Sequence, residues 1–180
     1  MIESKLIPKA LFSDKSVKSV NNLKDYAGIE YIASMNQTHS DVVTFVKSSA
    51  VYDSDGIYTE EPKLGLVVQT ADCMPILLSD KKRIGAIHSG WRGLKNNILE
   101  KAIKKFDVNE LSISIGPHAQ SCCYEVKEDV KKYFNDYTEL RDEMFFLNMS
   151  QVLKDLSEDE GFQVDISSIC TICNSFYYSY

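Results

Sequence analysis

The stretch of sequence that decides the fold covers residues 73–93 and reads CMPILLSDKKRIGAIHSGWRG. Two apolar runs of strand length, at 75–79 and 83–88, flank a lysine pair that predicts an exposed turn. The simplest arrangement of these runs is an antiparallel hairpin. Such a hairpin would bring Cys73, just before its first strand, to the same end as His88, the last residue of its second strand.

Upstream of this hairpin the sequence predicts further short strands. Residues 65–70 predict a buried strand that leads directly to the hairpin, and residues 29–35 and 42–46 have the composition of strands. His39 lies in the connection between the latter two. Residues 53–56, which read DSDG, predict a turn.

Downstream of the hairpin the apolar residues change to helical spacing. Residues 94–106 predict an amphipathic helix, and residues 126–136 and 150–158 predict two more. Strands are expected at 111–116 and 144–147. Strands and helices follow one another without regular βαβ units. We therefore expect an α+β fold, in which helices pack against a mixed β-sheet.

The composition is typical of a globular protein. Of the 180 residues, 44% are hydrophobic and 26% are charged, and we expect one domain over residues 1–180. The net charge of −6 gives no global attraction for nucleic acid. No run reaches the ~18 apolar residues of a membrane span, and the first residues lack the apolar core of a secretory signal. We therefore expect a cytoplasmic protein that binds neither nucleic acid nor membranes; the sequence favours no particular oligomeric state.

The five cysteines, an odd number at uneven spacings, do not match the disulfide framework of a small secreted protein. We expect their thiols to be reduced. A single CxxC motif, from Cys170 to Cys173, is weak evidence for a metal site when no second pair accompanies it. The adjacent Cys122 and Cys123 are predicted to be unable to bind one metal ion without strain.

Two histidines and one cysteine lie in unusual sequence contexts. They are His39 in NQTHSD, Cys73 in TADCMP and His88 in AIHSGWRG. Two imidazoles and a thiolate are donors that zinc prefers. Three protein ligands leave one coordination position open, which is the pattern of catalytic rather than structural zinc sites. The remaining histidine, His118, follows Gly-Pro, and we expect it not to bind metal.

Two charged residues beside these candidate ligands point to further roles. Asp72 is a candidate general base or a support for a ligand histidine, although neighbouring side chains on a regular strand point to opposite faces. Arg92 lies where a helix is expected to begin, near residue 93, and a helix start with an arginine favours phosphate or carboxylate. The alternative is that Trp91 packs in the core and Arg92 pairs with an acidic neighbour.

Four tracts in this order resemble the YfiH-like family. They are NQTH at 36–39, TADCMPILL at 70–78, AIHSGWRG at 86–93, and a tract at 115–126 that begins with IGP and ends with CYEV. The family has been called multicopper polyphenol oxidase or laccase-domain, and its members are now regarded as purine nucleoside phosphorylases. The resemblance covers residues 30–180.

This resemblance implies a zinc site formed by His39, Cys73 and His88, with copper as the alternative metal. It also implies phosphorolysis of adenosine, inosine, guanosine and methylthioadenosine, with adenosine deamination as a second activity. The partners would then be purine nucleosides and phosphate. Relatives usually have a longer N-terminal part and continue past the tract at 176–180 through an arginine- and glycine-containing segment. If that segment closes the pocket, we expect reduced activity or a pocket completed by another subunit.

Three other functions would use the same residues. Full laccase chemistry needs more histidines than the three in the chain. A cysteine hydrolase would use Cys73 as nucleophile and His88 or His39 as base, on an acyl substrate such as a cell-wall peptide precursor. It would need neither metal nor phosphate. In the last alternative, zinc would only stabilise an interaction module.

Overall fold

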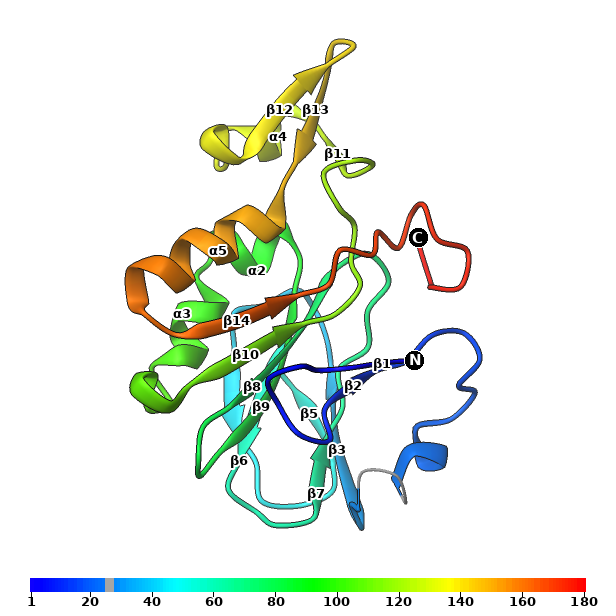
Figure 1. Ribbon diagram of the computed structural model, residues 1–180, viewed down its shortest axis with the longest axis vertical. Helices are drawn as coiled ribbons and strands as arrows, with labels where there is room; N and C mark the ends of the chain where they lie inside the picture. Colours follow the sequence, from blue (N-terminus) through cyan, green and yellow to red (C-terminus); the bar gives the residue numbers. More distant parts are fainter. Residues whose placement is uncertain (25–27) are drawn as a thin grey trace.

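The structure, a computed structural model, describes residues 1–24 and 28–180. Its centre is a six-stranded mixed sheet with the strand order β14-β10-β8-β9-β6-β4 (Figure 1). These strands are β4 (Val43–Phe45), β6 (Gly56–Thr59), β8 (Met74–Ser79), β9 (Ile84–Ser89), β10 (Ser112–Ile115) and β14 (Gln163–Ile166). Strands β14 and β10 are parallel, as are β6 and β4, and the other neighbours are antiparallel.

The predicted hairpin is the middle of this sheet. Strands β8 and β9 pair antiparallel, with Pro75 opposite His88 and Met74 opposite Ser89. Because Cys73 directly precedes β8, it lies at the end of the sheet where His88 also lies. Both strands are buried along most of their length, since further strands flank them on either side and other elements cover both sheet faces.

Three smaller sheets surround the central one. The first contains β3 (Tyr31–Asn36), β5 (Val51–Asp53) and β7 (Leu64–Leu66), all parallel. The second contains β11 (Glu125–Val126), β12 (Thr138–Arg141) and β13 (Met144–Leu147), and it projects from the rest of the molecule (Figure 1). The third is the N-terminal pair β1 (Ile2–Glu3) and β2 (Leu11–Phe12).

The strand predicted at 65–70 is shorter than expected. Strand β7 ends at Leu66, and the side chain of Gln37 then takes over the backbone groups of Gln69. The Gln37 amide donates to the Gln69 carbonyl at 2.6 Å and accepts from the Gln69 N–H at 3.0 Å. These side-chain bonds replace the hydrogen bonds of a sheet, so the chain is free to turn before Asp72.

The helix predicted at 94–106 consists of two short helices, α2 (Trp91–Lys95) and α3 (Ile98–Ile103). The break lies at Asn97, whose φ of 60° is in the left-handed region that asparagine tolerates better than most residues. The helix predicted at 126–136 is reduced to α4 (Glu128–Lys131). It starts later than predicted because Val126 pairs with Phe145 as part of strand β11.

The helix predicted at 150–158 is present as α5 (Met149–Glu160). The side chain of Asn148 caps its first turn by accepting from the backbone N–H of Gln151, and Gly161 ends it with a φ of 81°. The described part of the chain also contains the short 3-10 helices η1 (Val20–Leu23), η2 (Val108–Glu110) and η3 (Asn135–Tyr137).

The main core lies between the central sheet and the helices that cover one of its faces (Figure 1). The fully buried members from the sheet and from α3 and α5 include Ile76, Leu78, Ile87, Ile113, Ile115, Ile98, Leu99 and Leu153. The N-terminal segment covers the opposite face, where Phe12 packs so closely on Gly116 that a side chain there would collide with the ring. These elements form the expected α+β fold. None of the helices in the described part of the chain is long and apolar enough to cross a membrane.

Candidate metal centre

The three predicted metal ligands converge at one end of the central sheet. His39 lies in the connection between β3 and β4, Cys73 directly before β8, and His88 within β9. Their ligand atoms all lie within 4.8 Å of one another. The Cys73 Sγ is 3.8 Å from the His39 Nε2, and the two imidazole rings meet edge to face with their centroids 4.8 Å apart. The sequence prediction that these residues come together is thus met in the structure.

The donor set and the space around it fit a zinc ion. With Zn–S and Zn–N bonds of usual length, a tetrahedral site places sulfur and nitrogen about 3.6 Å apart, which is close to the 3.8 Å between Cys73 and His39. Gly90 provides the room beside the sulfur. A Cβ atom at Gly90 would lie only 2.7 Å from the Cys73 Sγ and 3.8 Å from the His39 Cδ2. Glycine is therefore required there by close packing against the thiol.

A buried carboxylate, Asp55, positions two of the three ligands. It accepts hydrogen bonds from the backbone N–H groups of Thr38, His39 and Ser40 at 3.1, 3.0 and 2.6 Å. The Ser40 hydroxyl and the His88 Nδ1 also donate to it, both at 2.7 Å. Burial raises the pKa of Asp55, but the hydrogen bonds from Ser40 and His88 outweigh burial and hold this pKa below its ordinary value. The turn predicted at 53–56 thus contains Asp55, the residue that positions both histidines of the site.

Asp55 also sets the tautomer of His88. Because a carboxylate only accepts, the proton of the neutral imidazole is on Nδ1, and the Nε2 lone pair is free to bind a metal. Burial lowers the pKa of His88 and outweighs the opposite effect of Asp55. The imidazole is therefore neutral at neutral pH, which is the form that binds metal.

The thiol of Cys73 is protonated at neutral pH when no metal ion is bound to it. Burial is the main cause that raises the pKa of Cys73 to about 11. The carboxylates of Asp72 and Asp55 act in the same direction, and Arg92 opposes them. A metal ion would displace the proton, because a coordinating thiol is deprotonated by the cation it binds.

Two residues of the site have left-handed backbone conformations. His39 has a φ of 61° and Asp72 a φ of 75°, and residues other than glycine rarely adopt such values. The surrounding hydrogen bonds hold both: Asp55 binds the backbone around His39, and the Asp72 carbonyl accepts from the Ala119 N–H at 2.9 Å. Strained backbone of this kind is often found at functional sites.

The side chain of Asp72 binds the C-terminal segment. Its Oδ1 accepts from the Thr171 hydroxyl at 2.7 Å, and its Oδ2 accepts from the Ser179 hydroxyl at 3.1 Å and the Tyr180 N–H at 2.8 Å. The carboxylate that hydrogen-bonds a candidate ligand histidine is Asp55, which the sequence analysis did not single out. A catalytic role of Asp72 stays a prediction.

Arg92 and Tyr124 lie beside the candidate ligands. The Arg92 guanidinium stacks on the Trp91 ring, 4.5 Å from its centroid, and its charge acts on both Cys73 and Tyr124. Helix α2 has five residues, so its dipole adds little to this charge. Burial raises the pKa of Tyr124 to about 12, with Cys73 as the next cause, so the phenol is a hydrogen-bond donor. Sequence reasoning missed Tyr124, whose only signal was its place in the CYEV tract.

His118 has a structural position. It is fully buried, and its ring nitrogens lie 2.8 Å from the Gly116 carbonyl and 2.9 Å from the Ser150 hydroxyl. Both nitrogens are therefore engaged within the protein, in keeping with the expectation that His118 does not bind metal.

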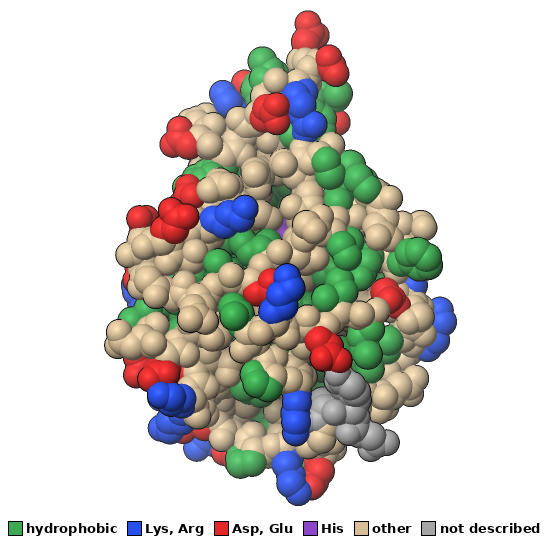
Figure 2. All heavy atoms as spheres, viewed as in Figure 1, with side chains coloured by type: hydrophobic (Ala, Val, Ile, Leu, Met, Phe, Trp, Pro, Cys, Tyr) green, Lys and Arg blue, Asp and Glu red, His purple; other side chains and the backbone are tan. Residues whose placement is uncertain are grey.

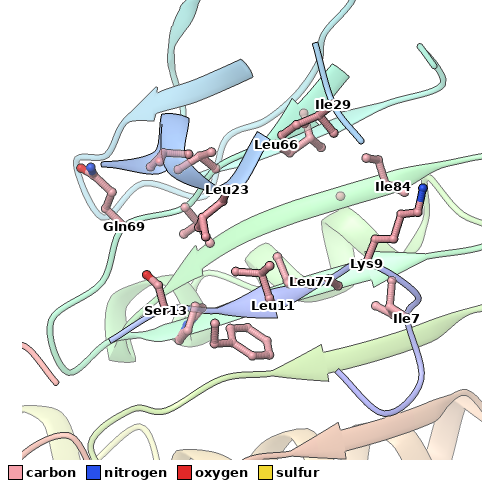
Figure 3. Close-up of a pocket in the computed structure, with 18 of the residues that line it drawn as sticks. Ile7, Lys9, Leu11, Ser13, Leu23, Ile29, Leu66, Gln69, Leu77 and Ile84 are labelled. Carbon is pink, nitrogen blue, oxygen red and sulfur yellow. The ribbon is translucent and has the colours of Figure 1, made fainter. Parts of the chain in front are cut away.

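A cavity of about 940 Å³ lies between the N-terminal segment and the central sheet (Figure 3). Its wall is largely apolar and includes Leu11, Leu23, Leu66 and Leu77, and Gln69 lies at its edge. The three candidate metal ligands are not among the described residues that line this cavity. Its lining does include Thr171, which hydrogen-bonds Asp72 beside Cys73.

Charged side chains of both signs are interspersed on the face shown in Figure 2. No large basic area covers this face, which agrees with the net charge of −6. An anion that binds at the metal centre must therefore be attracted by local groups, of which Arg92 is the nearest candidate.

These observations define a protein with an α+β fold and a His-Cys-His cluster at one end of its central sheet. The family model described as multi-copper polyphenol oxidoreductase laccase matches residues 14–180, and the chain belongs to this family. The motif-based resemblance to the YfiH-like, laccase-domain proteins is thereby confirmed.

Relatives with similar sequences carry the name purine nucleoside phosphorylase. The chain is 32% identical over 163 residues to one from Aquifex aeolicus, with 87% of this chain and 79% of the relative covered. It is 29% identical over 173 residues to one from Clostridium acetobutylicum, with 88% and 73% covered. Similarity to proteins of this name favours a phosphorylase-like enzyme.

Solved structures with the same fold include proteins from two bacteria. A Neisseria meningitidis protein superposes with a TM-score of 0.78 at 26% identity, covering 89% of this chain and 72% of that one. The Bacillus licheniformis protein YfiH superposes with a TM-score of 0.75 at 24% identity, covering 89% and 74%. The second likeness concerns the fold alone.

Proposed function

We propose that this protein is a zinc-dependent purine nucleoside phosphorylase, with the metal held by His39, Cys73 and His88. The observation that carries the proposal is the convergence of these donors in front of Asp55, which presents His88 as a neutral ligand. Three ligands leave a coordination position for substrate, as in catalytic zinc sites. The names of the relatives support the reaction class.

In the proposed reaction, a phosphate oxygen forms a bond to C1′ of the ribose as the bond from C1′ to the purine nitrogen breaks. The purine leaves with the bonding electron pair and takes up a proton. A bound zinc ion would supply a Lewis acid that polarises a substrate atom. Arg92 would hold the phosphate, since a guanidinium is suited to phosphate oxygens. Tyr124 would donate a hydrogen bond to the nucleoside or to the phosphate.

The proposed substrates are adenosine, inosine, guanosine and methylthioadenosine, with adenosine deamination as a second activity at the same centre. Zinc is the proposed metal, although copper binds the same donors more tightly, so that supply decides between them. The metal found in the protein as isolated distinguishes the two.

The environment of Cys73 argues against a cysteine hydrolase. Catalytic cysteines have a lowered pKa, so that the thiolate is present at neutral pH. Here burial and two nearby carboxylates raise the pKa of Cys73 to about 11. The metal-free protein should therefore react slowly with iodoacetamide at Cys73, and rapid alkylation there would favour the hydrolase.

The test of the proposed function is chromatography of adenosine after incubation with the protein, with and without phosphate. Wild type should release adenine and ribose 1-phosphate only when phosphate is present. Cys73→Ala should lose both the metal and this activity. Arg92→Ala should keep the metal and need more phosphate, whereas Lys95→Ala, on the same helix, should behave as wild type. Zinc-loaded wild type that leaves adenosine unchanged would contradict the proposal.

Deamination is a separate outcome of the same experiment. Inosine formed without phosphate by wild type, and lost in Cys73→Ala, would support the second activity. Inosine formation that survives Cys73→Ala would show that a contaminating deaminase produces it.

A further inference from the structure

A second cluster of sulfur atoms lies outside the metal centre. Cys122 and Cys123 belong to the turn between β10 and β11, and Cys170 and Cys173 to the C-terminal segment. The two segments meet at an isolated parallel β-bridge, in which the backbone of His118 pairs with that of Cys170 (Figure 1). All four sulfur atoms lie within 4.8 Å of one another.

The spacing of these sulfur atoms fits a tetrahedral metal site. A zinc ion with four bonds of about 2.3 Å to sulfur places the sulfur atoms about 3.8 Å apart. The Cys173 Sγ is 3.6 Å from the Cys122 Sγ and 2.9 Å from the Cys123 Sγ. These two distances are shorter than the expected value, and all the others are at most 4.8 Å. Small rotations of the side chains would therefore bring the four sulfur atoms to the corners of a tetrahedron.

The adjacency of Cys122 and Cys123 does not prevent them from serving one metal, contrary to the sequence-based interpretation. Both sulfur atoms reach Cys173, and neither cysteine is among the residues with a positive φ. The turn directs the two side chains to the same place. More than forty residues separate this pair from the CxxC motif in the sequence. Only the folded structure shows that Cys122 and Cys123 are the second pair of thiols beside the motif.

The backbone stabilises negative charge on the sulfur atom of Cys170. The Cys170 Sγ accepts a hydrogen bond of 3.4 Å from the backbone N–H of Gln120. The Arg141 guanidinium donates to the carbonyl of Ser121, which immediately precedes the cysteine pair. A cation therefore stands next to a site that would carry excess negative charge.

We propose that Cys122, Cys123, Cys170 and Cys173 bind a structural zinc ion, distinct from the metal at His39, Cys73 and His88. Each thiol releases its proton to solvent as its Zn–S bond forms, which leaves a tetrathiolate complex of net charge −2. Four protein ligands fill the coordination sphere, so this ion has no position for substrate. Its role is to join the C-terminal segment to the turn before β11.

This junction would support the active site from a distance. The C-terminal segment also provides Thr171, Ser179 and Tyr180 as hydrogen-bond donors to Asp72, the neighbour of Cys73. On the other side of the junction, the turn leads directly into Tyr124, beside the metal centre. The zinc ion would therefore hold both segments in register with the site.

A disulfide between Cys123 and Cys173 is the competing arrangement. Their sulfur atoms are 2.9 Å apart, beyond the 2.03–2.05 Å of a disulfide bond. A disulfide would also leave Cys122 and Cys170 without a role, whereas zinc uses all four thiols.

The test is the zinc content of the full chain, purified with a thiol reductant. Wild type should hold about two zinc ions, Cys73→Ala about one, and Cys170→Ser/Cys173→Ser about one. The variants separate the two proposals. If only the double variant loses zinc, the proposed active-site zinc is refuted. If only Cys73→Ala loses zinc, the proposed structural zinc is refuted. Thr171→Ser is the matched control, because it also introduces a serine into the CxxC motif but removes no thiol. This variant should retain both zinc ions.

Two measurements keep the test decisive if the double variant fails to fold. Cobalt added to metal-free Cys73→Ala should produce the sulfur-to-cobalt charge-transfer bands of a tetrathiolate site. In wild type, zinc should protect the four cysteines from iodoacetamide, as mapped by peptide mass spectrometry, and chelation should restore their labelling. Absence of the cobalt bands, equal labelling with and without zinc, or a Cys123–Cys173 disulfide in the reduced, zinc-supplied protein would overturn the proposal.

Discussion

At the scale of single residues, Asp55 connects the two histidines of the metal centre. It binds the backbone around His39 and the Nδ1 of His88, and it is completely buried. A carboxylate in this position orients a ligand histidine and increases its basicity. The site therefore depends on a residue that would not itself touch the metal.

Replacing Asp55 with asparagine should weaken metal binding about 10- to 100-fold. An amide has the shape of the carboxylate, but its NH₂ group would face one of the donors that now point at Asp55. Asp53→Asn is the matched control, because Asp53 is exposed and accepts a hydrogen bond from Asn36. Competition with a chromophoric chelator measures the zinc affinity, and equal affinities in the two variants would contradict the assigned role.

Gly90→Ala should abolish metal binding at the centre. The new Cβ would lie 2.7 Å from the Cys73 Sγ, so the thiol would have to move away from the histidines. Gly161→Ala is the control for general destabilisation: its φ of 81° makes alanine unfavourable, but no atom lies within 4 Å of the new Cβ. We expect a lower melting temperature in both variants and loss of zinc from the centre only in Gly90→Ala. Zinc bound there as in wild type would show that the close packing is unimportant.

His118 should make the protein less stable in mild acid. Burial lowers the pKa of His118 below its usual 6.5, so between these two values the unfolded chain binds more protons. The free energy of unfolding must then fall as the pH falls below about 6.5, by up to about 1.4 kcal/mol per pH unit. Urea unfolding at pH 7.5 and 5.5 should show a smaller loss for His118→Gln than for wild type. Equal losses would mean that His118 does not contribute.

At the scale of secondary-structure elements, the break between α2 and α3 depends on the conformation of Asn97. Its φ of 60° is tolerated by glycine and asparagine and is unfavourable for other residues, because their Cβ atom crowds the backbone in this conformation. Asn97→Ala should lower the free energy of unfolding by about 1 kcal/mol, and Asn97→Gly should leave it nearly unchanged. Chemical denaturation measures both, and an alanine variant as stable as the glycine variant would contradict this explanation.

The element scale also shows what the sequence could predict. The hairpin of β8 and β9 was predicted because its two apolar runs and lysine turn are local features, and the same holds for the helical spacing of the apolar residues in α5. Strand β7 and the helix predicted at 126–136 were predicted too long. Partners outside each stretch account for part of the difference. The Gln37 side chain bonds Gln69 after β7, and the pairing of Val126 with Phe145 puts the first residue of the predicted helix into a strand.

The same distinction applies to the site. His39, Cys73 and His88 could be selected from the sequence because two of only three histidines and a cysteine stand in unusual contexts. Asp55 could not, because DSDG is also an ordinary turn sequence and its burial depends on strands that pack around it. The four-cysteine cluster was missed for a similar reason, since its pairs meet only when the C-terminal segment folds beside the turn before β11.

At the scale of the whole molecule, one end of the central sheet gathers the functional groups. The connections that hold His39 and Cys73, strand β9 with His88, and the C-terminal segment on Asp72 all meet there. The large apolar cavity lies between the N-terminal segment and the sheet (Figure 3). The three candidate metal ligands are not among the described residues that line it.

The most direct test of the central claim is anomalous diffraction from crystals of wild-type protein, recorded on both sides of the zinc absorption edge. We predict a zinc peak bound by His39, Cys73 and His88, with a Zn–S distance of about 2.3 Å and Zn–N distances of about 2.0–2.1 Å. A map from zinc-supplied protein with no peak at these three side chains would contradict the account.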